Sequence, residues 1–212
     1  AGIGKSRFAT EYLGLLRDGA SEQVVFRSAA AAGDSGLGYA LWARLLLGIA
    51  GGTDIPADVG GLADALEESL GVEVDRGGLS EACFLLPVAL GEPVDAPTGI
   101  DGLRGRVAGF LAGLLRPAAE ASGVTVFLDD MHWADDDSRA LLRPFLEACG
   151  DSPLRVLLAY RPTDPRGRPV ELELPESGVR AAEITLRPLD TGTSEQLLSK
   201  LEAGKGAAGP AS

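Results

Sequence analysis

The first six residues, AGIGKS, have the types and the order expected of a loop that wraps a polyphosphate. Gly4, Lys5 and Ser6 fit the last three positions of the pattern G-x-x-x-x-G-K-[ST], whose first two positions would precede Ala1. Glycine lets backbone N–H groups approach the phosphates closely, the lysine reaches the β- and γ-phosphates, and the serine hydroxyl binds Mg²⁺. The residues that we assign to the nucleotide are Ala1, Gly2, Ile3, Gly4, Lys5, Ser6 and Arg7. For Arg7, which follows the loop serine, a place on the surface of the next helix is the alternative.

Two adjacent acids end an apolar run, VTVFLDD, at residues 124–130. A buried strand that ends in aspartate places the carboxylate at the carboxyl edge of the sheet, where open α/β sheets bind ligands. We expect Asp129 to hold Mg²⁺ opposite Ser6, and Asp130 to position the attacking water. A strand-end turn with solvated carboxylates is the plain alternative. The combination of the two acids with the Gly-Lys-Ser opening favours a nucleotide site.

Alternating strands and helices must bring these residues together. Apolar residues at helical spacing predict one set of elements and short β-rich runs predict the other, so we expect an α/β fold with a parallel sheet covered on both faces. Residues 51–102 are expected to be an irregular helical insertion, with short helices at 62–70 and 80–90, and residues 204–212 a flexible tail. The other predicted helices are 5–17, 39–49, 103–121, 135–149 and 193–201, and the predicted strands are 23–28, 124–130, 154–160 and 182–186.

Composition excludes several classes of function. The formal net charge of −12 argues against direct nucleic-acid binding by this segment, because phosphate contacts need clustered basic residues. Cys83 and Cys149 have no partner at metal-ligand spacing, and with His132 as the single histidine they indicate free thiols and no zinc site. No apolar run is long enough to span a membrane and no signal peptide is visible, so we expect a cytoplasmic protein.

Residues 126–135, VFLDDMHWAD, resemble the Walker B stretch of the STAND-class P-loop ATPases, which are relatives of the AAA+ proteins. They are especially similar to the ATPase domain of the large ATP-binding LuxR-type transcriptional regulators. Residues 157–161, LLAYR, are similar to the strand that carries the sensor-1 position, where Arg161 would approach the γ-phosphate as a catalytic residue. Residues 184–189, ITLRPL, resemble the last core strand. For Arg161, a solvated charge at the strand end is the alternative.

The resemblance implies a P-loop NTPase three-layer sandwich over residues 1–203, with a mostly parallel sheet whose first, central strand precedes Ala1. It implies ATP and Mg²⁺ as cofactors, and Asp130 in place of the more common Glu suggests slow hydrolysis. The implied partners are downstream sensor and DNA-binding modules of the same parent chain, with self-association of the parent protein. Three alternatives stay open: regulation of a fused nucleotide cyclase or Ser/Thr kinase, an ordinary P-loop small-molecule kinase, and a fragment that binds no nucleotide because it lacks that strand.

The residues that follow the two acids allow two interpretations. An exposed His132 beside a phosphate site could sense the state of the nucleotide, or it could be a polar neighbour without a role. Trp133 is expected to pack the loop against the sheet.

Overall fold

The structure, a computed structural model, describes residues 3–17, 23–34, 38–52, 58–83, 100–187 and 192–193. The order of elements along these residues alternates helices with three strands, as the sequence predicts. The elements are α1 (Lys5–Arg17), β1 (Val24–Ala29), α2 (Ala40–Ile49), α3 (Val59–Leu70), α4 (Arg76–Ala82), α6 (Ile100–Ser122), β2 (Val124–Asp129), the 3₁₀ helix η2 (Met131–Trp133), α7 (Asp136–Cys149) and β3 (Arg155–Leu158).

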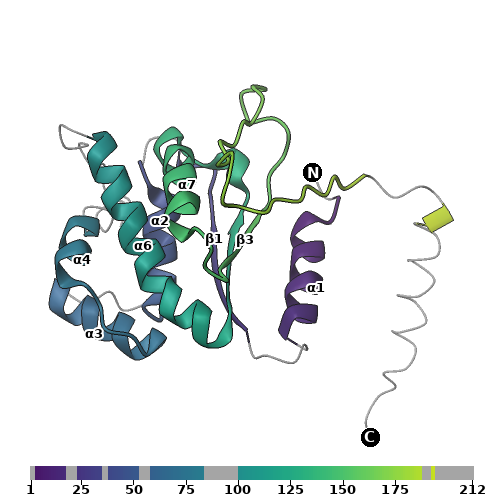
Figure 1. Cartoon of the computed structure of the whole chain (residues 1–212). Helices are drawn as coiled ribbons and strands as arrows, with labels where there is room; N and C mark the ends of the chain where they lie inside the picture. The colour runs from purple at the N-terminus through teal and green to yellow at the C-terminus, as the bar shows by residue number, and fades with distance from the viewer. Residues whose placement is uncertain are drawn as a thin grey trace, which may run out of the picture.

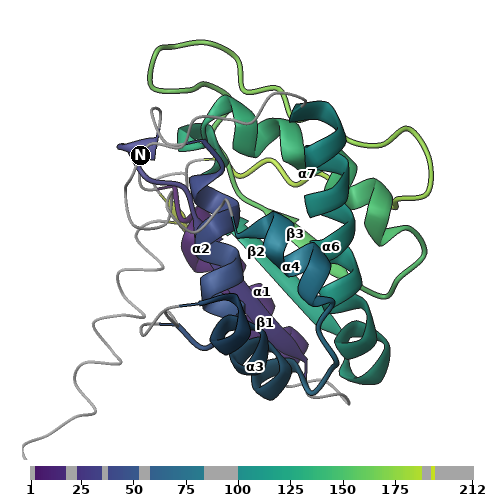
Figure 2. The same ribbon diagram turned by 90° about the vertical axis from the view of Figure 1, so that its left-hand side faces the viewer.

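Three layers make up the molecule (Figure 1). The described strands form one parallel sheet in the order β1-β2-β3, in which Ala29 of β1 pairs with Asp129 and Leu128 pairs with Leu158 of β3. Helix α1 covers one face of the sheet, while α2, α6 and α7 cover the other, and α3 and α4 lie outside them (Figures 1 and 2). The expectation of an α/β fold with a parallel sheet covered on both faces is therefore confirmed for the described residues.

Strand β2 is the centre of the core, because residues 124–128 are all buried. The side chains of Val126 and Leu128 face the larger hydrophobic cluster formed with α2, α6 and α7. Phe127 points to the opposite face and packs with Ala9 and Leu13 of α1. Burial on both faces explains the continuous apolar run of this strand, since a strand with one wet face would alternate apolar and polar residues.

Helix α4 corrects the prediction of a helix at residues 80–90, because the helix begins earlier, at Arg76. Gly77 and Gly78 discourage a helix by propensity. The carboxylate of Asp75 nevertheless caps the helix by accepting a hydrogen bond from the Gly77 N–H at 3.0 Å. A Cβ atom on Gly78 would lie 2.8 Å from the ring of Phe110 in α6, so the glycine permits the close approach of the two helices. Residues 84–90 lie outside the described residues.

The predicted strand at residues 182–186 is wrong, because these residues have no regular structure and Ile184 is 66% exposed. A strand needs a neighbour that supplies ladder hydrogen bonds, and no described strand runs beside this segment. The predicted helix at 193–201 and the tail at 204–212 lie outside the described residues, except for Thr193. In the described part of the chain, no helix is both long and apolar enough to cross a membrane.

The two-sided core generates a test of stability. Leu111 of α6 is fully buried, so Leu111→Ala should lower the free energy of unfolding by about 2–5 kcal/mol, through lost transfer energy and a residual cavity. Leu15→Ala is the matched control, because the Leu15 side chain in α1 is 72% exposed and its loss should cost less than about 0.5 kcal/mol. Urea unfolding of both variants checks the difference. Equal losses would contradict the assignment of the core to the α6 side of the sheet.

Candidate functional site

The loop serine and the strand-end aspartate meet at the carboxyl edge of the sheet. Helix α1 begins at Lys5, directly after Gly4, whose φ of +90° is a conformation that favours glycine. The Ser6 hydroxyl donates a hydrogen bond to Asp129 Oδ2 at 3.1 Å, across 123 positions of the chain. Two side-chain oxygens of the kind that Mg²⁺ prefers therefore lie side by side.

The second acid has an unusual backbone. Asp130 adopts φ +52°, in the left-handed region that aspartate tolerates better than most residues. Its backbone N–H donates to Asp129 Oδ1 at 2.8 Å, which fixes the orientation of the first carboxylate and leaves Oδ2 to Ser6. The Asp130 side chain is 41% exposed, and its Oδ1 lies 3.7 Å from Nδ1 of His132. The turn thus presents two differently oriented carboxylates at one place.

Two positive charges lie near these carboxylates. Lys5 is partly buried at the start of α1, and Arg161 is exposed just beyond β3. The charges of both groups act on the pKa of His132, which places them near the turn that follows Asp130. The chain beyond β3 is held alongside this turn, because the Met131 N–H donates to the Ala159 carbonyl at 3.0 Å. Arg161 follows two residues after this contact, and Lys5 immediately precedes the serine that contacts Asp129.

The remaining loop residues are less informative. Ala1 and Gly2 lie outside the described residues, and Ile3 is 41% exposed. The Arg7 side chain is 69% exposed and its Nε lies 3.9 Å from Oε1 of Glu11, one helical turn further on. The structure thus places Arg7 on the solvent-exposed face of α1. This is the alternative to nucleotide binding that the sequence left open for Arg7.

His132 is buried, not exposed as one of the two sequence interpretations required. Its side chain is only 2% exposed, and neither ring nitrogen has a hydrogen-bond partner among the described residues. Burial lowers the pKa of His132; the nearby carboxylate of Asp130 opposes this effect, while Arg161 and Lys5 add to it. The ring is therefore neutral at pH 7. Trp133 packs against the main core, as expected.

Asp135 holds the segment after the two acids in place, a role that sequence reasoning assigned only to a helix start. Its Oδ1 accepts hydrogen bonds from the backbone N–H of Ser138 at 2.7 Å and of Tyr39 at 3.0 Å. Its Oδ2 accepts the Ser138 hydroxyl at 2.6 Å. Asp135 is 7% exposed, and burial raises its pKa although these hydrogen bonds lower it. One carboxylate thereby caps α7 and anchors the chain before α2.

Tyr39 extends this anchor to one further helix, α6. Its φ of +63° is rare for a bulky residue, and the contact with Asp135 helps to hold it. The Tyr39 hydroxyl accepts a hydrogen bond from Arg104 Nε of α6 at 2.9 Å, and Arg104 Nη2 also bonds Asp137 Oδ1 of α7 at 2.5 Å. No sequence signal pointed to this network, because Tyr39 and Asp135 are 96 positions apart.

Comparison with known proteins agrees with this geometry. Residues 1–158, most of the chain, match the family model of the AAA ATPase domain, and the chain therefore belongs to that family. No curated protein and no solved structure matches the chain. Family membership supports nucleotide binding and an ATPase-type function, and domains of this family bind ATP, generally with Mg²⁺. The three-layer fold is consistent with a P-loop NTPase.

The anchor role of Asp135 is testable by substitution. Asp135→Ala removes the cap of α7 and the acceptor of the buried Tyr39 N–H, so the free energy of unfolding should fall by about 2–3 kcal/mol. Asp135→Asn should cost less, because its amide oxygen can accept both backbone N–H groups. Asp136→Ala is the matched control, since this neighbouring carboxylate is 84% exposed and should contribute less than about 1 kcal/mol. Urea unfolding that ranks Asp136→Ala equal to Asp135→Ala would contradict the role.

The raised pKa of Asp135 predicts how the stability of the wild type and of Asp135→Asn depends on pH. The ordinary pKa of aspartate is 3.8, and the pKa of Asp135 is higher in the folded state. At a pH between these two values, the Asp135 carboxyl group is therefore protonated in the folded protein and ionised in the unfolded chain. The stability that this group contributes is therefore greatest below pH 3.8 and is lost as pH rises through the folded pKa. Asparagine does not ionise. The stability of Asp135→Asn relative to the wild type should accordingly increase from below pH 3.8 to neutral pH, and a constant difference would contradict the shift.

Proposed function

We propose that this chain is the Mg-ATP-binding switch domain of a bacterial LuxR-type transcriptional regulator, with slow hydrolysis of ATP to ADP and phosphate. The observation that supports the nucleotide site most directly is the hydrogen bond between Ser6, in the first turn of α1, and Asp129, the last residue of β2. The resemblance of residues 126–135 to that class of regulators supports the output. Binding would place the phosphates at the start of α1, where backbone N–H groups and the helix dipole favour negative charge.

Five side chains of the site have a role in this proposal. Lys5 would neutralise charge on the β- and γ-phosphates, and Ser6 with Asp129 would hold Mg²⁺, which neutralises the phosphate oxygens when bound. Asp130 would orient the attacking water, and Arg161 would stabilise the γ-phosphate. The shorter side chain of Asp130, compared with Glu, leaves a water less closely held, which suits slow turnover and a switch.

The route from the nucleotide to the rest of the molecule passes through the segment between Asp129 and Asp135. This segment starts at the Mg²⁺ ligand and ends at the carboxylate that anchors α7 and the chain before α2. A change at the γ-phosphate that shifts Asp130 would thus also shift the contacts of α7 and of the chain before α2. Such coupling of a phosphate contact to packed elements is how nucleotide switches control their partners.

The proposal includes a further strand of the sheet. Among the described strands, β3 pairs with β2 only, and no described strand lies beside residues 182–186. A strand that precedes Ala1 and lies next to β3 would give β3 and residues 182–186 a neighbouring strand. The same strand would lead directly into the phosphate loop. In the parent protein, sensor and DNA-binding modules of the same chain would receive the signal.

Calorimetry with Mg-ATP tests the nucleotide site. We would titrate this chain and a version extended upstream by about one strand, ~10 residues that include the first loop glycine. The extended form should bind Mg-ATP, and Lys5→Ala should abolish binding, because the lysine supplies the point charge for the β- and γ-phosphates. Arg155→Ala is the charge-matched control: Arg155 begins β3, at the opposite edge of the sheet, and its loss should leave binding unchanged.

The outcomes separate a domain that binds the nucleotide from a fragment that does not. Binding by the shorter chain as well would mean that the additional strand matters little for the site. If the extended form folds but does not bind Mg-ATP, the proposal is wrong, and the domain is a scaffold with a vestigial nucleotide site.

A further inference from the structure

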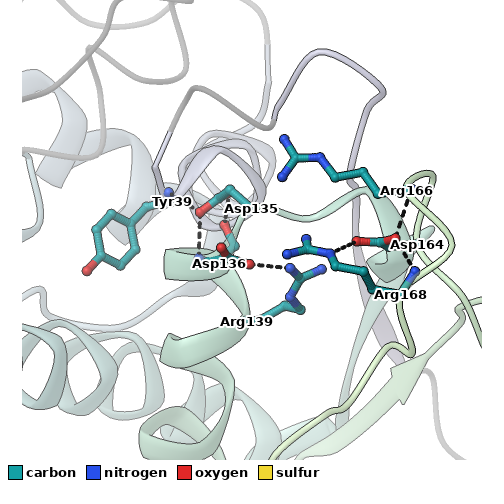
Figure 3. Close-up of polar contacts among 8 residues, drawn as sticks. Tyr39, Asp135, Asp136, Arg139, Asp164, Arg166 and Arg168 are labelled. Atoms are coloured by element: carbon teal, nitrogen blue, oxygen red, sulfur yellow. Dashed lines mark hydrogen bonds and ion pairs between the residues drawn. The ribbon is translucent and has the colours of Figure 1, made fainter.

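A cavity of about 210 Å³ lies beside the proposed nucleotide site. Its walls come from the turn after β2, the first turns of α7 and the loop that follows β3 (Figure 3), together with Ala32 from the segment after β1. None of the residues that we assign to Mg-ATP lines this cavity. Its volume is that of a small organic molecule, below the range of drug-sized ligand pockets of about 300–1,000 Å³.

Three arginines and three aspartates line the cavity. Two of the arginines form ion pairs, and the third, Arg166, has no ion-pair partner among the described residues. Arg139 forms an ion pair with Asp136, and Arg168 Nε lies 2.8 Å from Oδ2 of Asp164. Asp135 is already committed to its hydrogen bonds with Ser138 and Tyr39. The guanidinium of Arg166 makes no hydrogen bond or ion pair within the described chain. Figure 3 shows the Arg139, Arg166 and Arg168 side chains extending into the same gap.

The loop that carries Arg166 is built around a buried carboxylate. Asp164 is 8% exposed, and its Oδ1 accepts the backbone N–H groups of Arg166 at 2.9 Å and Arg168 at 2.8 Å. Although burial by itself raises the pKa of Asp164, these bonds and the Arg168 side chain hold it below its ordinary value. Thr163 and Pro169 also form an antiparallel bridge across the loop. Arg166 is thus presented from a loop with fixed backbone hydrogen bonds.

The rest of the wall is apolar, with one exception. Trp133, Ala134 and Pro165 supply apolar surface. His132 also lines the cavity, and it is the buried side chain whose two ring nitrogens have no hydrogen-bond partner among the described residues. The cavity therefore offers an unpaired guanidinium and an apolar surface together.

We propose that this cavity is a second ligand site, which takes a small organic anion. The carboxylate or phosphate group of the ligand binds Arg166, and a compact apolar body rests against Trp133. Guanidinium groups bind both head groups through paired hydrogen bonds, so the shared chemistry is an oxyanion on an apolar body. The proposal does not depend on the nucleotide site. If both sites are occupied, the contact between His132 and Asp130 joins them.

The test uses benzoate, phenyl phosphate and the neutral benzyl alcohol as probes, and follows the indole N–H signals of the two tryptophans by nuclear magnetic resonance. Trp133→Phe assigns the signals. Benzoate or phenyl phosphate should shift the Trp133 signal in a saturable way, and the preferred probe identifies the head group. The signal of Trp42, whose indole N–H donates to the Ser138 carbonyl at 2.8 Å, reports that each variant is folded. Benzyl alcohol should leave the Trp133 signal unchanged.

Arg166→Ala should raise the dissociation constant of the preferred probe about tenfold or more, because it removes a charge-assisted contact. Arg180→Ala is the matched control, since Arg180 is an exposed arginine of the same segment outside the cavity wall, and it should change nothing. Lys5→Ala should also leave probe binding unchanged. An equal response to benzyl alcohol, an Arg166→Ala variant that binds normally, or loss of binding in Lys5→Ala would each overturn the proposal, the last by placing the anion in the phosphate loop.

Discussion

The burial of β2 on both faces is the constraint on which the rest of this structure depends. The strand needs apolar cover on each side, and it receives α1 on one face and α2, α6 and α7 on the other. Because its neighbours β1 and β3 run parallel to it, their carboxyl ends reach the same edge of the sheet. Asp129 is the residue at which β2 leaves the core, and the proposed nucleotide site begins there.

The segment after β2 converts that position into a connected set of polar contacts. It starts with a carboxylate that contacts Ser6, passes through a left-handed Asp130 and a buried His132, and ends with Asp135 in the cap of α7. Three of its polar side chains contact parts of the chain far away in sequence or face a cavity. Few residues separate the phosphate end of the proposed site from helices on the other side of the sheet. In the proposed function, this closeness is the reason why a switch suits the domain better than fast catalysis.

His132 lies where the two proposed sites adjoin. Its pKa responds to Asp130, Arg161 and Lys5 on the nucleotide side, while His132 is also one of the residues that line the cavity. Burial keeps the imidazole neutral, so it can donate one hydrogen bond and accept another. A small anion in the cavity and a nucleotide at Lys5 would therefore act on the same short turn, which gives a physical meaning to the run of polar residues after the strand.

The sequence by itself determined the elements near the site and the identity of its acids and bases. Local patterns were sufficient for α1, α2, α6 and α7, which have a strong apolar period, and for β2, which is a continuous apolar run. The types of Ser6 and Asp129 were sufficient to expect that these two side chains face each other. Prediction from sequence failed at residues 182–186, since a β-rich segment becomes a strand only beside a partner strand, and at α4, where the Asp75 cap and the close packing of Gly78 on α6 outweigh helix propensity. The bridge from Asp135 to Tyr39, the burial of His132 and the unpaired Arg166 were decided only by the tertiary structure. These features depend on which distant backbone groups and charges face each other, and no local pattern records that.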